Sequence, residues 1–408
     1  MSVDVVRRAP AGAHLLPAVR LILDEAPGGG ILDPLTDGHP VDHLRYKPGR
    51  SVVGRVHGPG GPRWIAGFSP RAAAKAGKLR HHAARRGLEL PMLEVPGAPG
   101  HVLLAGPVGE DKRLHRALKA AGLLEAGGGP RGHVLNYNPW RRLVLELPPG
   151  VLAGVEQRAV AKTAAAPHGS HGGAGATLAQ LVAGLHREGV PVLVPRESAD
   201  PRTLVYPHYG WGDWAGEGAG PDEGTCHAAA EALARLHRSA VHPFRHVDPA
   251  ARAAAAVRAV STVVPGAGEA AGRIARALLD AAARHDGSAH RSTHGVVHGD
   301  FSADQVLLGP DGIRFIDLDR IALGPAGWDL GCFAASELLA GRGTERSEEL
   351  LAAYGAGAPR LRPAVGAFRA WTGLHVLLRA VEPFRENRAD WAEQVVDRVR
   401  LAATAGLR

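Results

Sequence analysis

The stretch HGDFSADQVLL, residues 298–308, places a carboxylate and a side-chain amide five residues apart, at Asp300 and Gln305. A carboxylate in such a loop can orient or deprotonate an attacking hydroxyl group. A side-chain amide oxygen is a hard ligand that can bind a divalent cation such as Mg²⁺. The spacing therefore raises the question whether this is the catalytic loop of a phosphoryl-transfer enzyme, with Gln305 where such loops usually carry Asn.

A second pair of carboxylates follows at Asp317 and Asp319, in the segment IRFIDLD. The sequence GPDG (309–312) favours a tight turn, so the apolar runs on either side of it are expected to pair as a hairpin. A hairpin of this kind brings Asp300 and Asp317 to the opening of one shared site. Two carboxylates and an amide oxygen suit Mg²⁺. Phosphoryl transfer needs such a metal site, together with a base and a lysine for the α- and β-phosphates.

The order of the expected elements indicates an α+β chain. Strand-like segments lie mostly before residue 210 and around 296–318, whereas Ala-rich helical patterns occupy 224–285 and the sequence after 328. Clusters of Gly and Pro separate these segments and are typical of loops. A β-rich first half followed by a helix-rich second half predicts two lobes.

A weak internal repeat relates the first 130 residues to the segment that follows. HLRYKPGRSVV (43–53) resembles VLNYNPWRRLV (134–144), with Tyr, a Pro-containing turn, Arg and an apolar strand in the same order. The candidate strands after them, RWIAGFS and RAVAKTA, align Gly67 with Lys162. A true repeat and a turn style shared by two unrelated hairpins would both give this pattern.

Composition and charge narrow the class of protein. With 45% hydrophobic and 22% charged residues the chain is expected to fold into a globular body. The net charge is +8, but the arginines are scattered and no basic run is interleaved with aromatic residues, which disfavours nucleic acid as a partner. No run approaches the roughly 18 apolar residues of a membrane-spanning helix. Two cysteines, Cys226 and Cys332, are too few for a disulfide framework, which is typical of a reducing cytosol. We therefore expect a cytoplasmic protein, and we expect no signal peptide.

Residues 298–330 resemble the H-G-D-x-x-x-x-N loop and the following I-D strand of the aminoglycoside phosphotransferase and choline kinase-like family. EALARLHRSA (231–240) is similar to the L-A-x-L-H helix of that family, and GPAGWDLGCFAA (324–335) to the segment after its metal-binding aspartate. RAVAKTA is similar to the strand with the nucleotide lysine, and RTLVYPHYGWGDW (202–214) to the hinge. The resemblance covers roughly residues 131–408.

The resemblance implies a two-lobed protein-kinase-like fold with a small β-rich N-lobe and a larger helical C-lobe. Residues 131–209 would form the nucleotide-binding N-lobe. Residues 210–408 would form the C-lobe, with the catalytic loop and the acceptor pocket. Residues 1–130 lie outside the core resemblance, and we expect a folded N-terminal α/β cap there. A degenerate copy of the N-lobe is one form that this cap could take.

The resemblance also assigns roles in the catalytic loop. Asp300 would be the catalytic base, and Gln305 and Asp317 would bind Mg²⁺. His298 would support the backbone of the loop, and Asp329 would fix local structure rather than take part in chemistry. Gln305 departs from the family's usual Asn, but it keeps the amide oxygen, and maltokinase-like members of the wider family also carry Gln there.

The resemblance places the nucleotide against the N-lobe. Lys162 would contact the α- and β-phosphates of ATP, and backbone groups of Val205, Tyr206 and His208 would contact the adenine. The turn NPWRR lacks the glycines that allow a backbone to approach phosphates closely. Arg141 and Arg142 either compensate for them electrostatically or are solvated strand residues.

The helix that supplies a glutamate to the nucleotide lysine in this family is not apparent. ATLAQLVAGLHREG (176–189) is the candidate, but its only acid, Glu188, lies at the far end, and Gln180 cannot form an ion pair. Lys162 would then depend on another acid. This departure and the altered Asn favour a weak or inactive enzyme, whereas retention of Asp300 and Asp317 favours an active one.

The function that the resemblance implies is ATP-dependent phosphoryl transfer to a hydroxyl of a small molecule such as an antibiotic, a sugar or a related metabolite. The alternatives are a kinase-like enzyme that phosphorylates Ser or Thr of a precursor peptide, and a non-catalytic pseudokinase scaffold. The C-terminal helices, residues 330–408, carry slightly more Arg than acid in the stretch 361–391. An anionic, sugar-like or peptide acceptor is therefore favoured over a polycationic aminoglycoside.

Overall fold

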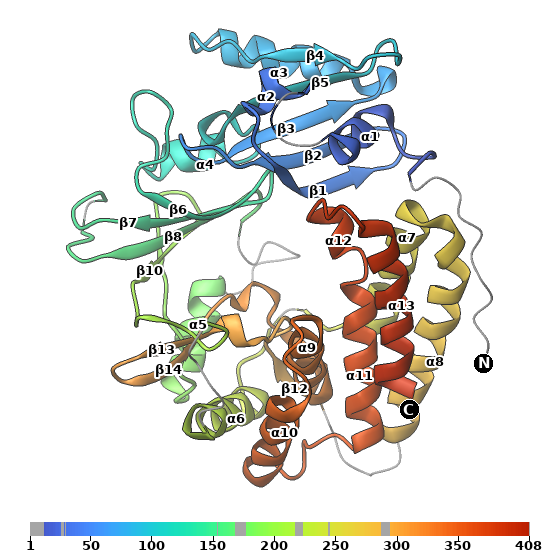
Figure 1. Cartoon of the computed structure of the whole chain (residues 1–408). Coiled ribbons are helices and arrows are strands. Elements are labelled where there is room, and N and C mark those ends of the chain that lie inside the picture. Colours follow the sequence, from blue (N-terminus) through green and yellow to red (C-terminus); the bar gives the residue numbers. More distant parts are fainter. Residues whose placement is uncertain are drawn as a thin grey trace.

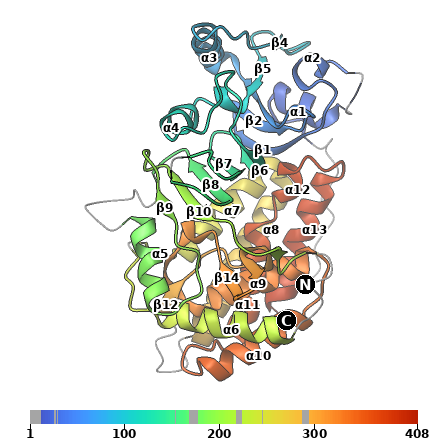
Figure 2. The ribbon, with the colours of Figure 1, turned by 90° about the vertical axis from the view of Figure 1, so that its left-hand side faces the viewer.

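The computed structural model describes residues 12–25, 28, 30–152, 154–167, 177–216, 223–243, 245–286 and 294–407. A first antiparallel sheet with its helices lies above a second antiparallel sheet and a large helical body (Figures 1 and 2). The prediction of an α+β chain, with its longer strands in the first half and most of its helices in the second, is confirmed.

The first sheet is antiparallel throughout and has the strand order β1-β2-β3-β5-β4. Its strands are β1 (Val41–Lys47), β2 (Ser51–Val56), β3 (Arg63–Phe68), β4 (Met92–Glu94) and β5 (Val102–Pro107). The helices around it are α1 (Pro17–Asp24), α2 (Asp33–Thr36), α3 (Ala74–Ala84) and α4 (His115–Ala120). Below, this unit is called the cap.

The second sheet repeats this topology, with the order β6-β7-β8-β10-β9. Its strands are β6 (His133–Asn138), β7 (Arg142–Leu147), β8 (Ala159–Ala164), β9 (Arg196–Glu197) and β10 (Thr203–Pro207). Helix α5 (Leu178–Arg187) lies between β8 and β9 in the sequence, as α3 lies between β3 and β4. The two sheets are therefore built on one plan.

The first turn of each sheet is the same at the level of single hydrogen bonds. In the β1–β2 turn the amide of Arg50 donates to the carbonyl of Lys47 at 3.0 Å. In the β6–β7 turn the amide of Arg141 donates to the carbonyl of Asn138, also at 3.0 Å. Each hairpin also has a register irregularity in its first strand. The sequence repeat thus corresponds to a structural repeat rather than to a turn style alone.

The residue before the turn arginine has a left-handed backbone in both copies. It is Gly49 with φ 65° in the cap and Trp140 with φ 61° in the second sheet. A positive φ is uncommon for a bulky residue and needs support from its surroundings. Trp140 has that support, because its ring packs near Trp64 and Phe68 of the cap and its amide donates to the Asp111 carboxylate at 2.7 Å.

The register corrects the alignment of Lys162 with Gly67. Val144 of β7 pairs with Lys162, and the corresponding Val53 of β2 pairs with Ala66. Ala66, rather than Gly67, therefore occupies the place of the lysine. The sequence alignment was off by one residue, because two short strands do not determine their own register, and a shift of one residue moves a side chain to the opposite face.

Gly67 has a packing role, because helix α1 lies directly on β3. A Cβ atom at Gly67 would lie 2.7 Å from the Ala18 Cβ and 3.0 Å from the Leu103 Cδ2. We expect Gly67→Ala to lower the free energy of unfolding by about 1–3 kcal/mol through overpacking. Gly77→Ala, in helix α3 with no neighbour within 4 Å, should instead raise it by about 0.5–1 kcal/mol. Urea unfolding checks this; equal signs for the two variants would contradict it.

The helical body contains eight helices among the described residues. They are α6 (Glu223–Arg238), α7 (Pro249–Val263), α8 (Gly268–Asp286), α9 (Ala326–Leu339), α10 (Glu345–Gly357), α11 (Val365–Leu378), α12 (Glu382–Arg385) and α13 (Trp391–Leu407). Short strands lie beside them: β11 (Gly212–Asp213), β12 (His294–Val297), β13 (Val306–Gly309), β14 (Gly312–Phe315) and β15 (Ala322–Pro325). The predicted hairpin is confirmed, since β13 and β14 pair from Val306–Phe315 to Gly309–Gly312.

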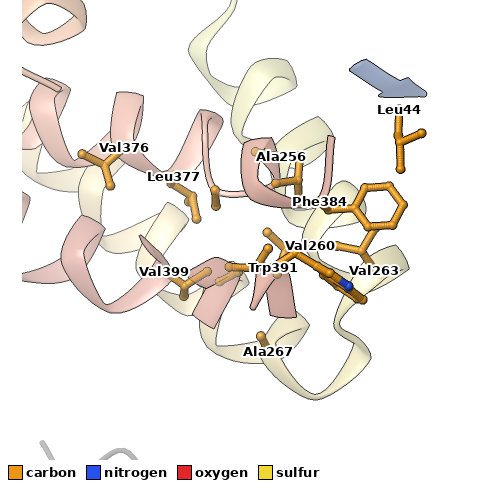
Figure 3. Close-up of a cluster of buried hydrophobic side chains, with 14 of the residues drawn as sticks. Leu44, Ala256, Val260, Val263, Ala267, Val376, Leu377, Phe384, Trp391 and Val399 are labelled. Carbon is orange, nitrogen blue, oxygen red and sulfur yellow. The ribbon is translucent and has the colours of Figure 1, made fainter. Parts of the chain in front are cut away.

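The cap packs on both the second sheet and the helical body. One face of its sheet shares a core with the second sheet, through residues such as Trp64 and Leu143. The other face, with α1 and Leu44, shares a core with α7, α8, α11 and α13, in which Phe384 and Trp391 lie close to Leu44 (Figure 3). No helix among the described residues is long and apolar enough to cross a membrane.

Candidate active site

The loop after β12 is held in place by a buried carboxylate. Asp329 of α9 has no exposed surface and accepts the amides of His298 at 2.6 Å and Gly299 at 2.8 Å. It also lies 3.0 Å from the Nε2 atom of His237 in α6. Gly299 has φ 84°, and a Cβ there would lie 2.3 Å from the carbonyl of Arg320. The loop that presents Asp300 is therefore set by a glycine turn on a carboxylate anchor.

We expect Asp329→Ala to lower the free energy of unfolding by about 3 kcal/mol or more. The reason is that the substitution leaves two buried amides and a buried imidazole without their acceptor. Urea denaturation followed by circular dichroism measures the change. Asp311→Ala, in the exposed β13–β14 turn, is the control and should stay within about 0.5 kcal/mol of the wild type. A small effect of Asp329→Ala would mean that the loop keeps its conformation without the Asp329 carboxylate.

The catalytic loop is joined to the second acidic segment. The Nε2 atom of His298 lies 2.8 Å from the carbonyl of Ile316, and the amide of Ile316 donates to the carbonyl of Gln305 at 3.1 Å. These contacts hold the backbone before Asp317 against the loop that carries Gln305. The geometry agrees with the supporting role expected of His298.

Asp317 is the centre of an ion-pair cluster formed by both lobes. Its backbone is left-handed, with φ 59°. Its carboxylate lies 2.5 Å from the Nζ atom of Lys162 and 2.9 Å from the Nη1 atom of Arg142. The Asp319 carboxylate lies 2.7 Å from the same Nζ atom. Burial alone would raise the pKa of Asp317, but the positive charges of Lys162 and Arg142 outweigh it and lower that pKa.

Lys162 has no acidic partner on helix α5. Gln180 serves the helix N-terminus instead, in a capping box in which its Oε1 atom accepts the amide of Thr177 at 2.8 Å. Glu188 accepts the hydroxyl of Ser239 at 2.6 Å, away from the lysine. The acids that hold Lys162, which is only 6% exposed, are Asp317 and Asp319.

Asp300 lies between two arginines. Its Oδ2 atom is 3.0 Å from the Nη1 atom of Arg320, and its Oδ1 atom is 3.5 Å from the Nη2 atom of Arg379. The same Nη2 atom lies 3.1 Å from the Sγ atom of Cys332, and burial raises the pKa of that thiol to about 12. Cys332 is therefore a neutral neighbour. The two guanidinium groups fix the orientation of the carboxylate and stabilise its charge.

A cavity of about 800 Å³ lies between the second sheet and the β13–β14 hairpin, and we call it the nucleotide cleft. The predicted site residues Lys162, Tyr206, His208, Gln305 and Asp317 line it. The approach of these residues, from β8, β10 and the catalytic segments, is what the sequence comparison implied. Burial and the nearby carboxylates raise the pKa of the Tyr206 phenol, so it stays protonated.

Two predicted nucleotide residues, Val205 and Arg141, do not line the nucleotide cleft, and the backbone contact expected of Val205 stays a prediction. The side chain of Val205 is buried in the core shared by the cap and the second sheet. Arg141 lines a different cavity, whereas the neighbouring Arg142 lines the nucleotide cleft. In addition, the amide of His208 donates to the carbonyl of Arg158 at 3.1 Å, which occupies the backbone donor that was expected to contact a base.

The structure gives a place in the site to two residues outside the assigned set, Arg142 and Trp211. Arg142 pairs with Asp317, and Trp211, which is 74% exposed, lines the mouth of the nucleotide cleft. A signal for Trp211 was present, because a tryptophan in a Gly-rich stretch next to the hinge has little apolar sequence around it to bury it. Arg142 could not be distinguished from Arg141, because both lie in one turn and only the sheet register decides which faces the cleft.

The donor atoms fit a hard divalent cation. The Nε2 atom of Gln305 donates to the Asp304 carboxylate at 2.7 Å, so the Oε1 atom is left as the ligand atom. Together with the carboxylate of Asp317 this gives oxygen donors only, as Mg²⁺ prefers. Within the described ranges no group of three or more His, Cys, Asp or Glu side chains could hold a metal by itself. Phosphate oxygens and water would therefore have to complete the coordination.

The segment that carries these residues matches a known protein family. Residues 179–364, which include the catalytic loop, Asp317 and Asp329, match the model of the phosphotransferase enzyme family, APH. This part of the chain is similar to that family. The matched segment is shorter than the expected 131–408, since it begins after the strand that carries Lys162. No curated protein matches the chain.

Solved structures resemble the chain in fold. The amicoumacin kinase hAmiN, solved with AMP-PNP, Ca²⁺ and Ami, is 12% identical, with 71% of this chain and 93% of that chain covered and a TM-score of 0.53. A choline/ethanolamine kinase family protein from Mesorhizobium loti is 17% identical, with 71% and 94% covered and a TM-score of 0.48. Choline kinase LicA from Streptococcus pneumoniae is 11% identical, with 67% and 92% covered and a TM-score of 0.48. The predicted two-lobed, protein-kinase-like fold is confirmed.

Proposed function

We propose that the chain transfers the γ-phosphoryl group of Mg²⁺-bound ATP to a hydroxyl group of a small molecule. One observation carries the proposal. Lys162 of the second sheet reaches across the nucleotide cleft to Asp317 and Asp319, at 2.5 and 2.7 Å, so phosphate-binding and metal-binding groups from two lobes meet at one point. That is the arrangement phosphoryl transfer requires.

In this proposal the catalytic loop supplies the base and a metal ligand. Asp300 accepts the proton of the acceptor hydroxyl as the acceptor oxygen bonds to the γ-phosphorus. The bond between that phosphorus and the bridging oxygen of the β-phosphate breaks, and ADP leaves with the electron pair. Gln305 and Asp317 would hold Mg²⁺, which supplies charge stabilisation for the β- and γ-phosphate oxygens when bound. Arg320 and Arg379 hold the Asp300 carboxylate in position.

The N-lobe residues bind and orient the nucleotide. Lys162 and Arg142 place two positive charges at the end of the cleft where the phosphates would lie. Tyr206 and the exposed Trp211 line the cleft where a base would lie. The buried contacts of Asp317 and Asp319 with Lys162 take the place of the helix glutamate that α5 lacks, which removes the main argument for an inactive pseudokinase.

Titration calorimetry with ATP tests the proposal. The full-length protein should bind ATP with micromolar affinity in Mg²⁺, and at least about tenfold more weakly in EDTA, because the metal links Asp317 and Gln305 to the phosphates. A hydroxylated acceptor added to this complex should then give ADP. Absence of ATP binding in Mg²⁺ would reject the proposal and leave a scaffold. Turnover only with a Ser- or Thr-containing peptide would reject the small-molecule acceptor.

A further inference from the structure

A second cavity, of about 550 Å³, adjoins the nucleotide cleft at Asp317. Asp300 lines this second cavity and not the cleft, whereas Asp317 and Arg142 line both. A γ-phosphate held near Asp317 would therefore be presented to the second cavity, next to the proposed base. In the proposed function this is the place of the acceptor.

Seven arginines line this cavity, and they come from four separate parts of the fold. The cap supplies Arg45 of β1 and Arg113. The β6–β7 turn supplies Arg141, and α7 supplies Arg252. The turn is pinned to the cap, because the Asp111 carboxylate accepts the amide of Trp140. These guanidinium groups are thus presented by rigid elements, as recognition of a ligand requires.

Among the described residues, the acids of the cavity pair with two of its seven arginines, Arg142 and Arg320, and the other five have no ion pair. Asp317 pairs with Lys162 and Arg142, and Asp300 pairs with Arg320 and Arg379. Asp319 pairs with Lys162.

Of the arginines without an ion pair, Arg45 and Arg245 donate to the backbone carbonyls of Pro139 and Asp319. Within the described part of the chain, the guanidinium groups of Arg113, Arg141 and Arg252 have no hydrogen-bond or ion-pair partner. The cavity therefore holds an excess of positive charge with unused donors.

The arginines also repel one another. Burial, and then repulsion from Arg141, Arg113 and Arg385, lowers the pKa of Arg45 to about 10. Burial and neighbouring arginines likewise lower the pKa of Arg141, Arg252 and Arg385. Like charges held close together cost free energy, which a bound anion would recover.

We propose that this cavity binds the acceptor through a phosphate or carboxylate group, so that the substrate is an anionic hydroxyl compound rather than a neutral sugar or a polycationic aminoglycoside. The inference rests on the proposed function and specifies its substrate class. Guanidinium groups suit an anionic acceptor, because their planar N–H donors match pairs of phosphate or carboxylate oxygens. The reaction is the transfer described above: the free hydroxyl attacks, its proton passes to Asp300, and the acceptor's own anionic group stays unchanged on the arginines.

The nucleotide is a poorer explanation of the same charges. Arg113, Arg141 and Arg252 do not line the nucleotide cleft, which has Lys162 and Arg142 for its phosphates. Two of the cavity's arginines also come from the cap, which contributes no residue to the cleft. The cap therefore gains a role in the choice of acceptor.

Calorimetry on the full-length protein saturated with Mg²⁺ and AMP-PNP tests the inference with matched probes. Ribose 5-phosphate is compared with ribose for the phosphate, and gluconate with glucose for the carboxylate. At least one anionic probe should bind tenfold or more tightly than its neutral partner. Arg141→Gln and Arg252→Gln should each weaken its binding at least tenfold, while the dissociation constant of AMP-PNP changes less than twofold.

The fold offers a matched control for each variant. Arg50→Gln changes the arginine at the same position of the other β-turn, and Arg258→Gln changes an exposed arginine of the same helix as Arg252. Neither lines the cavity, so neither should alter binding of the anionic probe.

Three results would overturn the inference. They are equal or absent binding of the anionic and neutral probes, loss of AMP-PNP binding in Arg141→Gln or Arg252→Gln, and tighter binding of kanamycin than of the anions. If the wild type does not bind AMP-PNP, the proposed function fails and the acceptor role with it. If AMP-PNP binds without any preference for anions, the present inference fails alone.

Discussion

Replacement of Asp300 by asparagine should lower the rate of phosphoryl transfer by about 10²–10⁴-fold, the contribution typical of a general base. Asparagine keeps the size of the side chain and can still accept a hydrogen bond from Arg320 or Arg379. It cannot take the proton of the acceptor hydroxyl. Asp300 does not line the nucleotide cleft, so the affinity for Mg²⁺ and ATP should stay within about twofold of the wild type. The expected signature is therefore a fall in kcat without loss of nucleotide binding.

The rate is measured as ADP release in the presence of an acceptor and as slow ATP hydrolysis in its absence. Asp311→Asn, in the exposed β13–β14 turn, changes the same charge in the same part of the chain and should leave both rates unchanged. An unchanged kcat in Asp300→Asn would show that the carboxylate only positions the loop. A parallel loss of ATP affinity would place Asp300 among the nucleotide or metal contacts.

The parts of the site that were predictable are those encoded within a short stretch. The Gly and Pro of the β13–β14 turn dictate the hairpin, and the hairpin carries Asp317 to the mouth of the catalytic loop. The position of Asp329 followed from the resemblance, and its hydrogen bonds to His298 and Gly299 agree with the structural role expected of it. Local turn chemistry and helix pattern were sufficient for this region.

The remainder depended on contacts between distant segments. The pairing of β7 with β8 decides whether Arg141 or Arg142 lines the nucleotide cleft. The alternation of apolar and polar residues in the sequence does not determine this register. The side chain of Val205 points to the cap, because two sheets bury the faces between them. The acid for Lys162 was sought on α5, where family precedent places it, but it comes from the segment after β14. No local pattern indicates a partner 155 residues away.

The arginine cavity was the least predictable feature. Its arginines are spread from β1 of the cap to the segment after β14, and in the sequence they read as a scattered compositional excess. These arginines come together only when the cap packs on both the second sheet and α7. The early inference that an anionic acceptor is favoured used the arginines of the C-terminal helices. The structure adds a cavity lined by other arginines, none of which belongs to those C-terminal helices.

Replacement of Asp317 by asparagine should remove most of the Mg²⁺-dependent affinity for ATP, by about 100-fold or more. Loss of a residue that only orients a metal ligand typically costs 10–100-fold in metal affinity, and Asp317 would itself be a ligand. Asp317 also neutralises Lys162 and Arg142, but Asp319 stays 2.7 Å from the lysine, so the variant should remain folded. Urea unfolding verifies this before the binding measurement.

The comparison with EDTA separates metal binding from charge. Without a metal the carboxylate of Asp317 repels the ATP phosphates and competes with them for Lys162 and Arg142. In EDTA, Asp317→Asn should therefore bind ATP as tightly as the wild type, or more tightly, although it is far weaker in Mg²⁺. Asp311→Asn is again the control and should follow the wild type in both buffers. If Asp317→Asn loses affinity equally with and without Mg²⁺, the carboxylate organises the phosphate-binding side chains and is not the metal ligand.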